Sequence, residues 1–129
     1  MNIGLGGKRK TILIVDKDAH ARAILRTALE AAAFTVGEAA NQQEGERTIK
    51  RIKPDAVLAD LVIDPIDGGG LMPSKLKDAG IDIPFYLVSS AVDALVGTVD
   101  LRELGVSGVF LKPVDSAVVV RTLKTRLDS

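Results

Sequence analysis

The sequence predicts an α/β fold in which a parallel sheet is covered by helices on both faces. Five short apolar runs alternate with five segments of helical periodicity, and the connections between them are short. Hydrophobic residues make up 47% of the chain and aromatic residues only 3%, so the core is built from aliphatic side chains, as in strands buried on both faces. The length of 129 residues fits one domain.

The predicted strands cover residues 11–16, 34–39, 54–60, 85–88 and 106–112. Apolar runs of about four to eight residues are typical of buried strands. The first and third runs each end on a carboxylate, Asp16 and Asp60. The second run is less apolar, which favours a position nearer an edge of the sheet. Pro84 precedes the fourth run, which leads into two serines, and the fifth run ends in Lys112.

Helices are predicted after Asp18, over residues 41–52, 71–79 and 92–104, and after Asp115 or Ser116, because these segments repeat apolar residues at helical spacing or begin with capping residues. The third helix is short, since Pro73 is tolerated only in a first turn. The positions expected to face the core are Ile24, Leu25, Ala28, Leu29 and Ala32 in the first helix, Ile49 and Ile52 in the second, and Val119, Val120, Leu123 and Leu127 in the last.

Charge and cysteine content exclude several classes of function. Seventeen basic and seventeen acidic residues cancel, so the sequence does not support direct binding to nucleic acid or to an anionic membrane. The chain has no cysteine and one histidine, so any metal is expected to be a hard cation on oxygen ligands. The absence of cysteine fits a cytoplasmic location. Residues 1–9 are interpreted as a flexible lead-in and 10–129 as the domain.

Four side chains are predicted at the carboxyl ends of the strands: Asp16, Asp60, Ser89 or Ser90, and Lys112. In open parallel sheets, ligands gather at this edge, near the point where the strand order reverses. An aspartate can accept a phosphoryl group as a mixed anhydride. A divalent metal on carboxylates, a lysine and a hydroxyl can share the charge of the three phosphoryl oxygens. The constellation therefore indicates phosphoryl handling.

These motifs resemble the receiver domain of two-component response regulators over about residues 10–128. The resemblance is carried by residues 12–16, the strand 54–60, Asp67-Gly68, Ser90-Ala91 and Lys112-Pro113. It implies a flavodoxin-like (βα)5 three-layer sandwich with strand order 2-1-3-4-5.

The resemblance also implies roles for individual residues. Asp60 is the expected phosphoacceptor, and Asp16, Asp60 and the main-chain carbonyl of Val62 are the expected Mg²⁺ ligands. Lys112 is expected to contact the phosphoryl group and to precede a cis proline bond. For the family's hydroxyl position, the spacings from Asp60 and Lys112 and the following alanine favour Ser90, whereas counting along the strand favours Ser89. Ser90 is the preferred choice.

The chain departs from the family pattern at several positions. Lys17 stands where receivers usually carry the second acid of the pair, so it either repels Mg²⁺ or partly replaces it beside Asp60. Asp18 and Asp64 are possible substitute ligands, although Asp18 is favoured as a helix cap. Val109 occupies the position of the usual aromatic switch residue.

Two further features of the fifth strand bear on the output. The neighbour of Val109, Phe110, is expected to point to the opposite face. Ser107-Gly108 replaces an acidic pair, so the dimer mode of the subgroup that binds DNA through a winged helix is not supported.

Three hypotheses about function follow. The first is a non-enzymatic receiver that takes a phosphoryl group on Asp60 from a histidine kinase or phosphotransfer protein and signals by contact with a downstream protein, as a monomer or weak homodimer. The second is a degenerate receiver that binds partners without phosphorylation. The third is a nucleotide-binding or small enzymatic domain of the same topology, against which the absence of a glycine-rich turn after the first strand argues.

Overall fold

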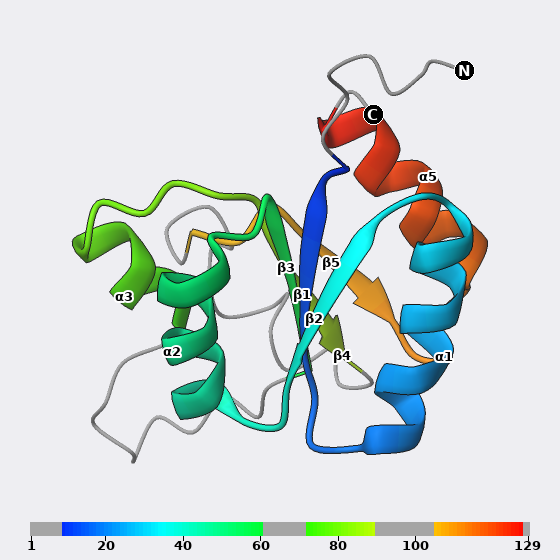
Figure 1. The fold of residues 1–129 in the computed structure, drawn as a ribbon, viewed down its shortest axis with the longest axis horizontal. Helices are drawn as coiled ribbons and strands as arrows, with labels where there is room; N and C mark the ends of the chain where they lie inside the picture. The colour runs from blue at the N-terminus through cyan, green and yellow to red at the C-terminus, as the bar shows by residue number, and fades with distance from the viewer. Residues whose placement is uncertain (1–8, 61–71, 90–104, 128–129) are drawn as a thin grey trace.

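A computed structural model describes residues 9–60, 72–89 and 105–127 of the chain. Its centre is a five-stranded parallel sheet with the order β2-β1-β3-β4-β5 (Figure 1). The strands are β1 (Thr11–Val15), β2 (Thr35–Ala39), β3 (Ala56–Ala59), β4 (Phe85–Ser89) and β5 (Gly108–Leu111). This arrangement confirms the predicted flavodoxin-like fold, and β2 lies at an edge of the sheet as its weaker apolar pattern predicted.

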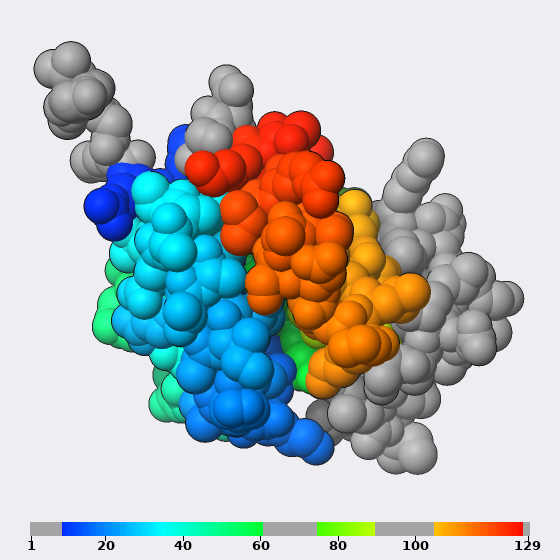
Figure 2. Space-filling model, turned by 90° about the vertical axis from the view of Figure 1, so that its right-hand side faces the viewer, coloured from blue at the N-terminus to red at the C-terminus, as the bar shows by residue number. Residues whose placement is uncertain are grey.

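Helices cover both faces of the sheet. On one face lie α1 (Ala19–Ala31) and α5 (Ser116–Leu127), and on the other lie α2 (Gln42–Ile52) and α3 (Met72–Asp78) (Figure 1). Figure 2 shows α1, in blue to cyan, and α5, in orange to red, packed side by side on their face of the molecule. The helix predicted over residues 92–104 lies outside the described residues.

The core consists of two apolar clusters, one on each side of the sheet. In β1, Ile12 and Ile14 belong to the cluster under α1 and α5, whereas Leu13 and Val15 belong to the cluster under α2 and α3. All four side chains are almost fully buried. Because successive side chains of a strand point to opposite faces, an uninterrupted apolar run supplies both clusters at once.

Side-chain caps fix where three helices begin. Asp18 caps α1 and accepts hydrogen bonds from the main-chain N–H groups of His20 and Ala21. Asn41 caps α2 through the N–H of Glu44. The Asp115 carboxylate accepts a hydrogen bond of 2.9 Å from the N–H of Ala117, so Asp115, rather than Ser116, caps α5.

Some predictions about local structure were wrong. Ile24 was expected to face the core, but it is 52% exposed, because the buried stripe of α1 runs through Leu25 and Leu29. Helical spacing identifies an apolar stripe but does not fix how wide a stripe the neighbouring layer covers. The third strand was expected over residues 54–60, but β3 is limited to Ala56–Ala59. The fifth strand was expected over residues 106–112, but β5 is limited to Gly108–Leu111.

Candidate functional site

Two aspartates follow neighbouring strands at the carboxyl edge of the sheet. Val15, the last residue of β1, is the register partner of Ala59, the last residue of β3. Asp16 and Asp60 come directly after this pair, and the N–H of Asp60 donates a hydrogen bond of 2.8 Å to the carbonyl of Val15. The parallel register therefore brings together two carboxylates that lie far apart in the sequence.

Asp16 is the more buried of the two, with only 4% of its surface exposed. Its N–H donates to the carbonyl of Ala39 in β2 at 3.0 Å, and its carboxylate accepts a hydrogen bond of 2.8 Å from the N–H of Asp18. Burial raises the pKa of the Asp16 carboxyl, and the negative charge of Asp60 raises it further. The pair thus concentrates negative charge at a poorly hydrated point of the rim.

Lys112, which follows the edge strand β5, also reaches Asp60 at the carboxyl end of the sheet. Its N–H donates to the carbonyl of Ser89 at 3.0 Å, which holds the chain beside the end of β4. Its ammonium contacts the Asp60 Oδ2 atom. This bond raises the pKa of Lys112, with smaller contributions from the charges of Asp60 and Asp16. The Lys112–Pro113 peptide bond is cis, as the resemblance implied.

Lys17 is exposed to solvent. Among the described residues, no carboxylate lies within ion-pair distance of its ammonium. Asp18 is committed to capping α1, which agrees with the preference for a cap over a metal ligand. Lys17 follows Asp16 directly in the chain, and its exposed ammonium forms no ion pair with an acid that the structure describes.

Several predicted site residues lie outside the described part of the chain. These are Ser90, Asp64 and the main-chain carbonyl of Val62. Ser89 is described: it ends β4 and is half-buried. The choice between Ser90 and Ser89 as the hydroxyl of the site stays a prediction.

Val109 and Phe110 point to opposite faces of β5, as predicted. Val109 packs against the cluster under α2 and α3, and Phe110 packs against the cluster under α1 and α5. The Phe110 ring lies 5.3 Å from the Tyr86 ring, centroid to centroid, at an interplanar angle of 33°. The aromatic ring of this region is therefore part of the core on the α5 side.

Two described side chains, those of Asp16 and Asp60, are suited to bind a magnesium ion. Asp16 and Asp60 are carboxylates, the ligands that Mg²⁺ prefers, and Mg²⁺ is often held by one or two carboxylates together with waters and phosphate oxygens. In residues 9–60, 72–89 and 105–127 no group of three potential metal-ligating side chains occurs. Asp16 and Asp60 are thus the described residues that would hold the ion.

The sequence did not reveal an ion-pair network beside this rim. Arg22 of α1 bonds to Glu38 of β2 at 2.9 Å, and its guanidinium also contacts the main-chain carbonyl of Asp16. Arg26, one helical turn later, bonds to the second oxygen of Glu38 at 2.5 Å. The sequence did contain one signal for this network: Arg22 and Arg26 are four residues apart, so they lie on the same face of α1 and can share one acid.

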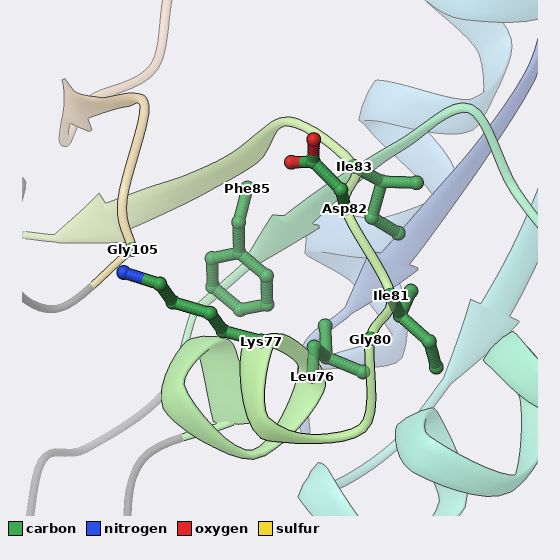
Figure 3. Close-up of a pocket in the computed structure, with 8 residues that line it drawn as sticks. All are labelled: Leu76, Lys77, Gly80, Ile81, Asp82, Ile83, Phe85 and Gly105. Carbon is green, nitrogen blue, oxygen red and sulfur yellow. The ribbon is translucent and has the colours of Figure 1, made fainter.

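A hollow of about 380 Å³ lies at the opposite end of the sheet, between α3 and the start of β4 (Figure 3). Leu76, Ile81, Ile83 and Phe85 line it with apolar surface, and Lys77 extends along it. It lies at the amino end of β4, far along the strands from Asp60. It plays no part in the rim constellation.

A parallel five-stranded sheet with two acids and a lysine at its carboxyl edge defines a receiver-type α/β domain. The chain matches the response regulator receiver domain family over residues 12–124, and it belongs to that family. Receivers of this kind are phosphoryl-accepting modules of two-component signalling and are generally not enzymes. They generally bind Mg²⁺ at the acidic pocket.

Curated relatives agree with this assignment. The chain is 32% identical over 120 residues to the phosphate regulon transcriptional regulatory protein PhoB of Pseudomonas aeruginosa. The matched region covers 92% of this chain and 52% of that protein. It is 30% identical over 106 residues to a probable transcriptional regulator, ycf27, of Porphyridium aerugineum, covering 82% of this chain and 43% of that protein. The chain thus spans about half the length of these relatives.

Solved structures show the same fold. The N-terminal domain of an uncharacterized protein from Wolinella succinogenes superposes with a TM-score of 0.77 at 28% identity, covering 94% of this chain and 95% of that one. A putative response regulator from Chloroflexus aurantiacus gives a TM-score of 0.77 at 25% identity, covering 95% of this chain and 100% of that one. None of the helices in the described residues is long and apolar enough to cross a membrane.

Proposed function

We propose that this chain is a phosphoryl-accepting receiver in which Asp60 is the acceptor and Lys112 stabilises the transferred group. Asp16 and Asp60, together with the carbonyl of Val62, hold Mg²⁺, and Ser90 supplies the hydroxyl. The observation that carries the proposal is the contact of the Lys112 ammonium with Asp60, directly beside the buried Asp16. A lysine held against one of two adjacent carboxylates is suited to an incoming group with three anionic oxygens.

The proposed phosphoryl transfer is a displacement at phosphorus. An oxygen of Asp60 forms a bond to phosphorus while the phosphorus–nitrogen bond of a phosphohistidine breaks, and the electron pair returns to the imidazole nitrogen. When bound, Mg²⁺ neutralises part of the charge on the phosphoryl oxygens. Lys112 moves its ammonium from the Asp60 carboxylate to a phosphoryl oxygen, which requires a short displacement of a partly exposed side chain.

The partners belong to the same proposal. The donor is a histidine kinase or phosphotransfer protein, and the output is contact with a downstream protein rather than catalysis or direct nucleic-acid binding. Two large apolar side chains support protein contact: Ile24 on α1 is 52% exposed and Leu111 at the end of β5 is 56% exposed. We further propose that the chain is a monomer or weak homodimer. Its proposed location is the cytoplasm, where it would meet its phosphoryl donor.

Phosphorylation can be tested with a small donor, which removes the need to know the kinase. The protein is incubated with acetyl phosphate, with and without Mg²⁺, and examined by mass spectrometry, with Asp60→Asn as the control. We expect a phosphoryl adduct in the native chain that is absent from Asp60→Asn. In parallel, beryllofluoride should shift the amide resonances of the rim. The absence of both responses under all conditions contradicts the proposal.

A second candidate function is a degenerate receiver that binds its partner without phosphorylation. The position of Lys17 favours it, because an exposed ammonium takes the place of the acid that usually serves the metal. In that case Lys112 and Asp60 form a permanent ion pair. The acetyl phosphate experiment distinguishes the two functions: a protein that still binds its partner, but never forms an adduct, is the degenerate form.

A further inference from the structure

The main-chain segment that carries Asp16 and Lys17 is held at several points. The N–H of Asp16 bonds to Ala39 in β2, its carboxylate bonds to the N–H of Asp18, and its carbonyl accepts from the guanidinium of Arg22. Val15 is the last residue of β1 that pairs with both neighbouring strands, so the peptide group that follows Asp16 is no longer held by the sheet on both sides. The bond from Arg22 therefore supplies the restraint that the sheet no longer provides.

Arg22 is itself held in place by Glu38. Its Nε bonds to Glu38 Oε1 at 2.9 Å while a terminal nitrogen reaches the Asp16 carbonyl. The Arg22 side chain is only 17% exposed, against 42% for Arg26. A planar guanidinium can donate to both acceptors at fixed angles, whereas the point charge of a lysine cannot reproduce this fork.

Glu38 joins this bond to the edge strand of the sheet. It lies in β2, where its register partner in β1 is Ile14, two residues before Asp16. Its second oxygen bonds to Arg26 at 2.5 Å, and Arg26 also bonds to Glu30 at 3.3 Å. Arg22 and Arg26 thus share Glu38, but only Arg22 also reaches the Asp16 peptide. The two arginines form a natural matched pair for an experiment.

We propose that Arg22 is a positioning residue for the Asp16–Asp60 rim: anchored by Glu38, it holds the Asp16 peptide so that the two carboxylates face the same ligand. This inference rests on the proposed function of the rim. Arg22 does not touch the ligand. It acts through the main chain of Asp16, and its loss lets this segment and the neighbouring Lys17 change direction.

The test compares Arg22→Gln and Arg22→Lys with Arg26→Gln, using Mg²⁺ alone as the probe and amide resonances as the readout. Groups that orient metal ligands typically change metal affinity by about 10- to 100-fold when they are replaced. We expect both Arg22 variants to lose about tenfold or more in Mg²⁺ affinity, while Arg26→Gln changes it by less than about twofold. Equal effects at the two positions, or native affinity in a folded Arg22→Gln variant, would overturn the proposal.

Amide hydrogen exchange supplies a readout that does not depend on any ligand. In the Arg22 variants the Asp18 amide, bonded to the Asp16 carboxylate, should exchange faster, while the Leu13 amide in the middle of β1 keeps its native rate. Unchanged exchange at Asp18 contradicts the positioning role. If the native protein binds no Mg²⁺ and accepts no phosphoryl group, the proposed function fails, and the Asp18 exchange alone decides the role of Arg22.

Replacement of Arg22 could also lower the stability of the fold, and a second variant separates this effect from positioning. Should Arg22→Gln fail to fold, Arg22→Lys keeps a positive charge beside Glu38 and removes only the fork geometry. Loss of affinity in a folded Arg22→Lys variant supports positioning by the guanidinium, and native affinity in that variant contradicts it.

Discussion

The ammonium of Lys112 contacts the carboxylate of Asp60, although the two residues lie 52 positions apart in the sequence. Asp60 follows β3 and Lys112 follows β5, with β4 between these two strands. The Lys112 side chain is 38% exposed and the Asp60 side chain 23%. Water therefore screens the pair, and the contact contributes little to folding stability.

Replacement of Asp60 should lower the pKa of Lys112. The hydrogen bond to Asp60 is the main reason why this pKa lies above its ordinary value of 10.5. In Asp60→Asn we expect the pKa to return toward that value, as measured by an NMR titration of the lysine side chain. Asp55→Asn is the control, since Asp55 bonds to the N–H of Thr11 at the other end of the sheet. An unchanged Lys112 pKa in Asp60→Asn would contradict the observed pairing.

Neutralising Asp16 should stabilise the fold at neutral pH. Burial and the charge of Asp60 raise the Asp16 pKa above 3.8, so the ionised carboxylate costs free energy in the native state. We expect Asp16→Asn to raise the free energy of unfolding by about 0.5–2 kcal/mol at pH 7, the usual range for stabilising substitutions. The gain should shrink as the pH falls through the raised pKa and should be absent below the unfolded-state pKa.

Urea unfolding of Asp16→Asn at several pH values measures this gain. Asp18→Asn serves as the matched control, because asparagine caps a helix about as well as aspartate. A destabilised Asp16→Asn variant at pH 7 would show that other contacts of the carboxylate outweigh its burial.

Glu38→Gln should destabilise the protein with the opposite pH dependence. The bonds from Arg26 and Arg22 hold the Glu38 pKa below its ordinary value of 4.5. Its stabilising contribution is therefore complete above that value and is lost as the pH falls through the lowered pKa. We expect a loss of about 1 kcal/mol at pH 7 in thermal or urea unfolding.

Glu30→Gln is the comparison for Glu38→Gln. The Glu30 side chain is 50% exposed and, among the described residues, pairs with Arg26 alone, so its replacement should cost less than about 0.5 kcal/mol. Equal losses for the two variants would mean that the contact of Glu38 with Arg22 adds nothing to stability.

Lys17→Asp should increase the affinity for Mg²⁺. The substitution replaces the lysine that directly follows Asp16 in the chain with the acid that receivers usually carry at this position. At an effective dielectric near 20, two unit charges about 4 Å apart interact by about 4 kcal/mol, and exposure reduces this figure. We expect a gain of about tenfold or more, equivalent to about 1.4 kcal/mol, in a Mg²⁺ titration followed by amide resonances.

The control for Lys17→Asp is Lys77→Asp, which makes the same change of charge on the exposed surface of α3 beside the hollow in Figure 3. It should leave the affinity unchanged. Unchanged affinity in Lys17→Asp itself would show that Lys17 does not limit Mg²⁺ binding.

Phe110→Ala should cost more stability than Val109→Ala. The Phe110 ring packs on Tyr86 and on the cluster under α5, and truncation of a buried aromatic residue typically costs about 3–5 kcal/mol. Because Phe110 is only partly buried, we expect about 2–3 kcal/mol, against about 1 kcal/mol for Val109→Ala, in chemical unfolding. A smaller cost for Phe110→Ala than for Val109→Ala would show that the ring does not anchor β5 to the α5 side.

The sequence by itself determined the sheet, most helices and the approximate positions of the rim residues. Apolar runs that end in Asp16 and Asp60 set two strands and their carboxyl ends, and Asp18 set the start of α1 through its cap. These features follow from local physics: strand alternation, helical spacing and the unpaired N–H groups of a first turn.

Only the tertiary structure decided how the side chains meet. The exposure of Ile24 depends on how far α5 covers α1, and the contact of Arg22 with the Asp16 carbonyl depends on how α1 lies beside β2. Likewise, the exposed position of Lys17 results from a loop whose direction is fixed by contacts with β2 and α1. Such contacts join segments that are remote along the chain, so their geometry depends on packing that no local pattern of residues encodes.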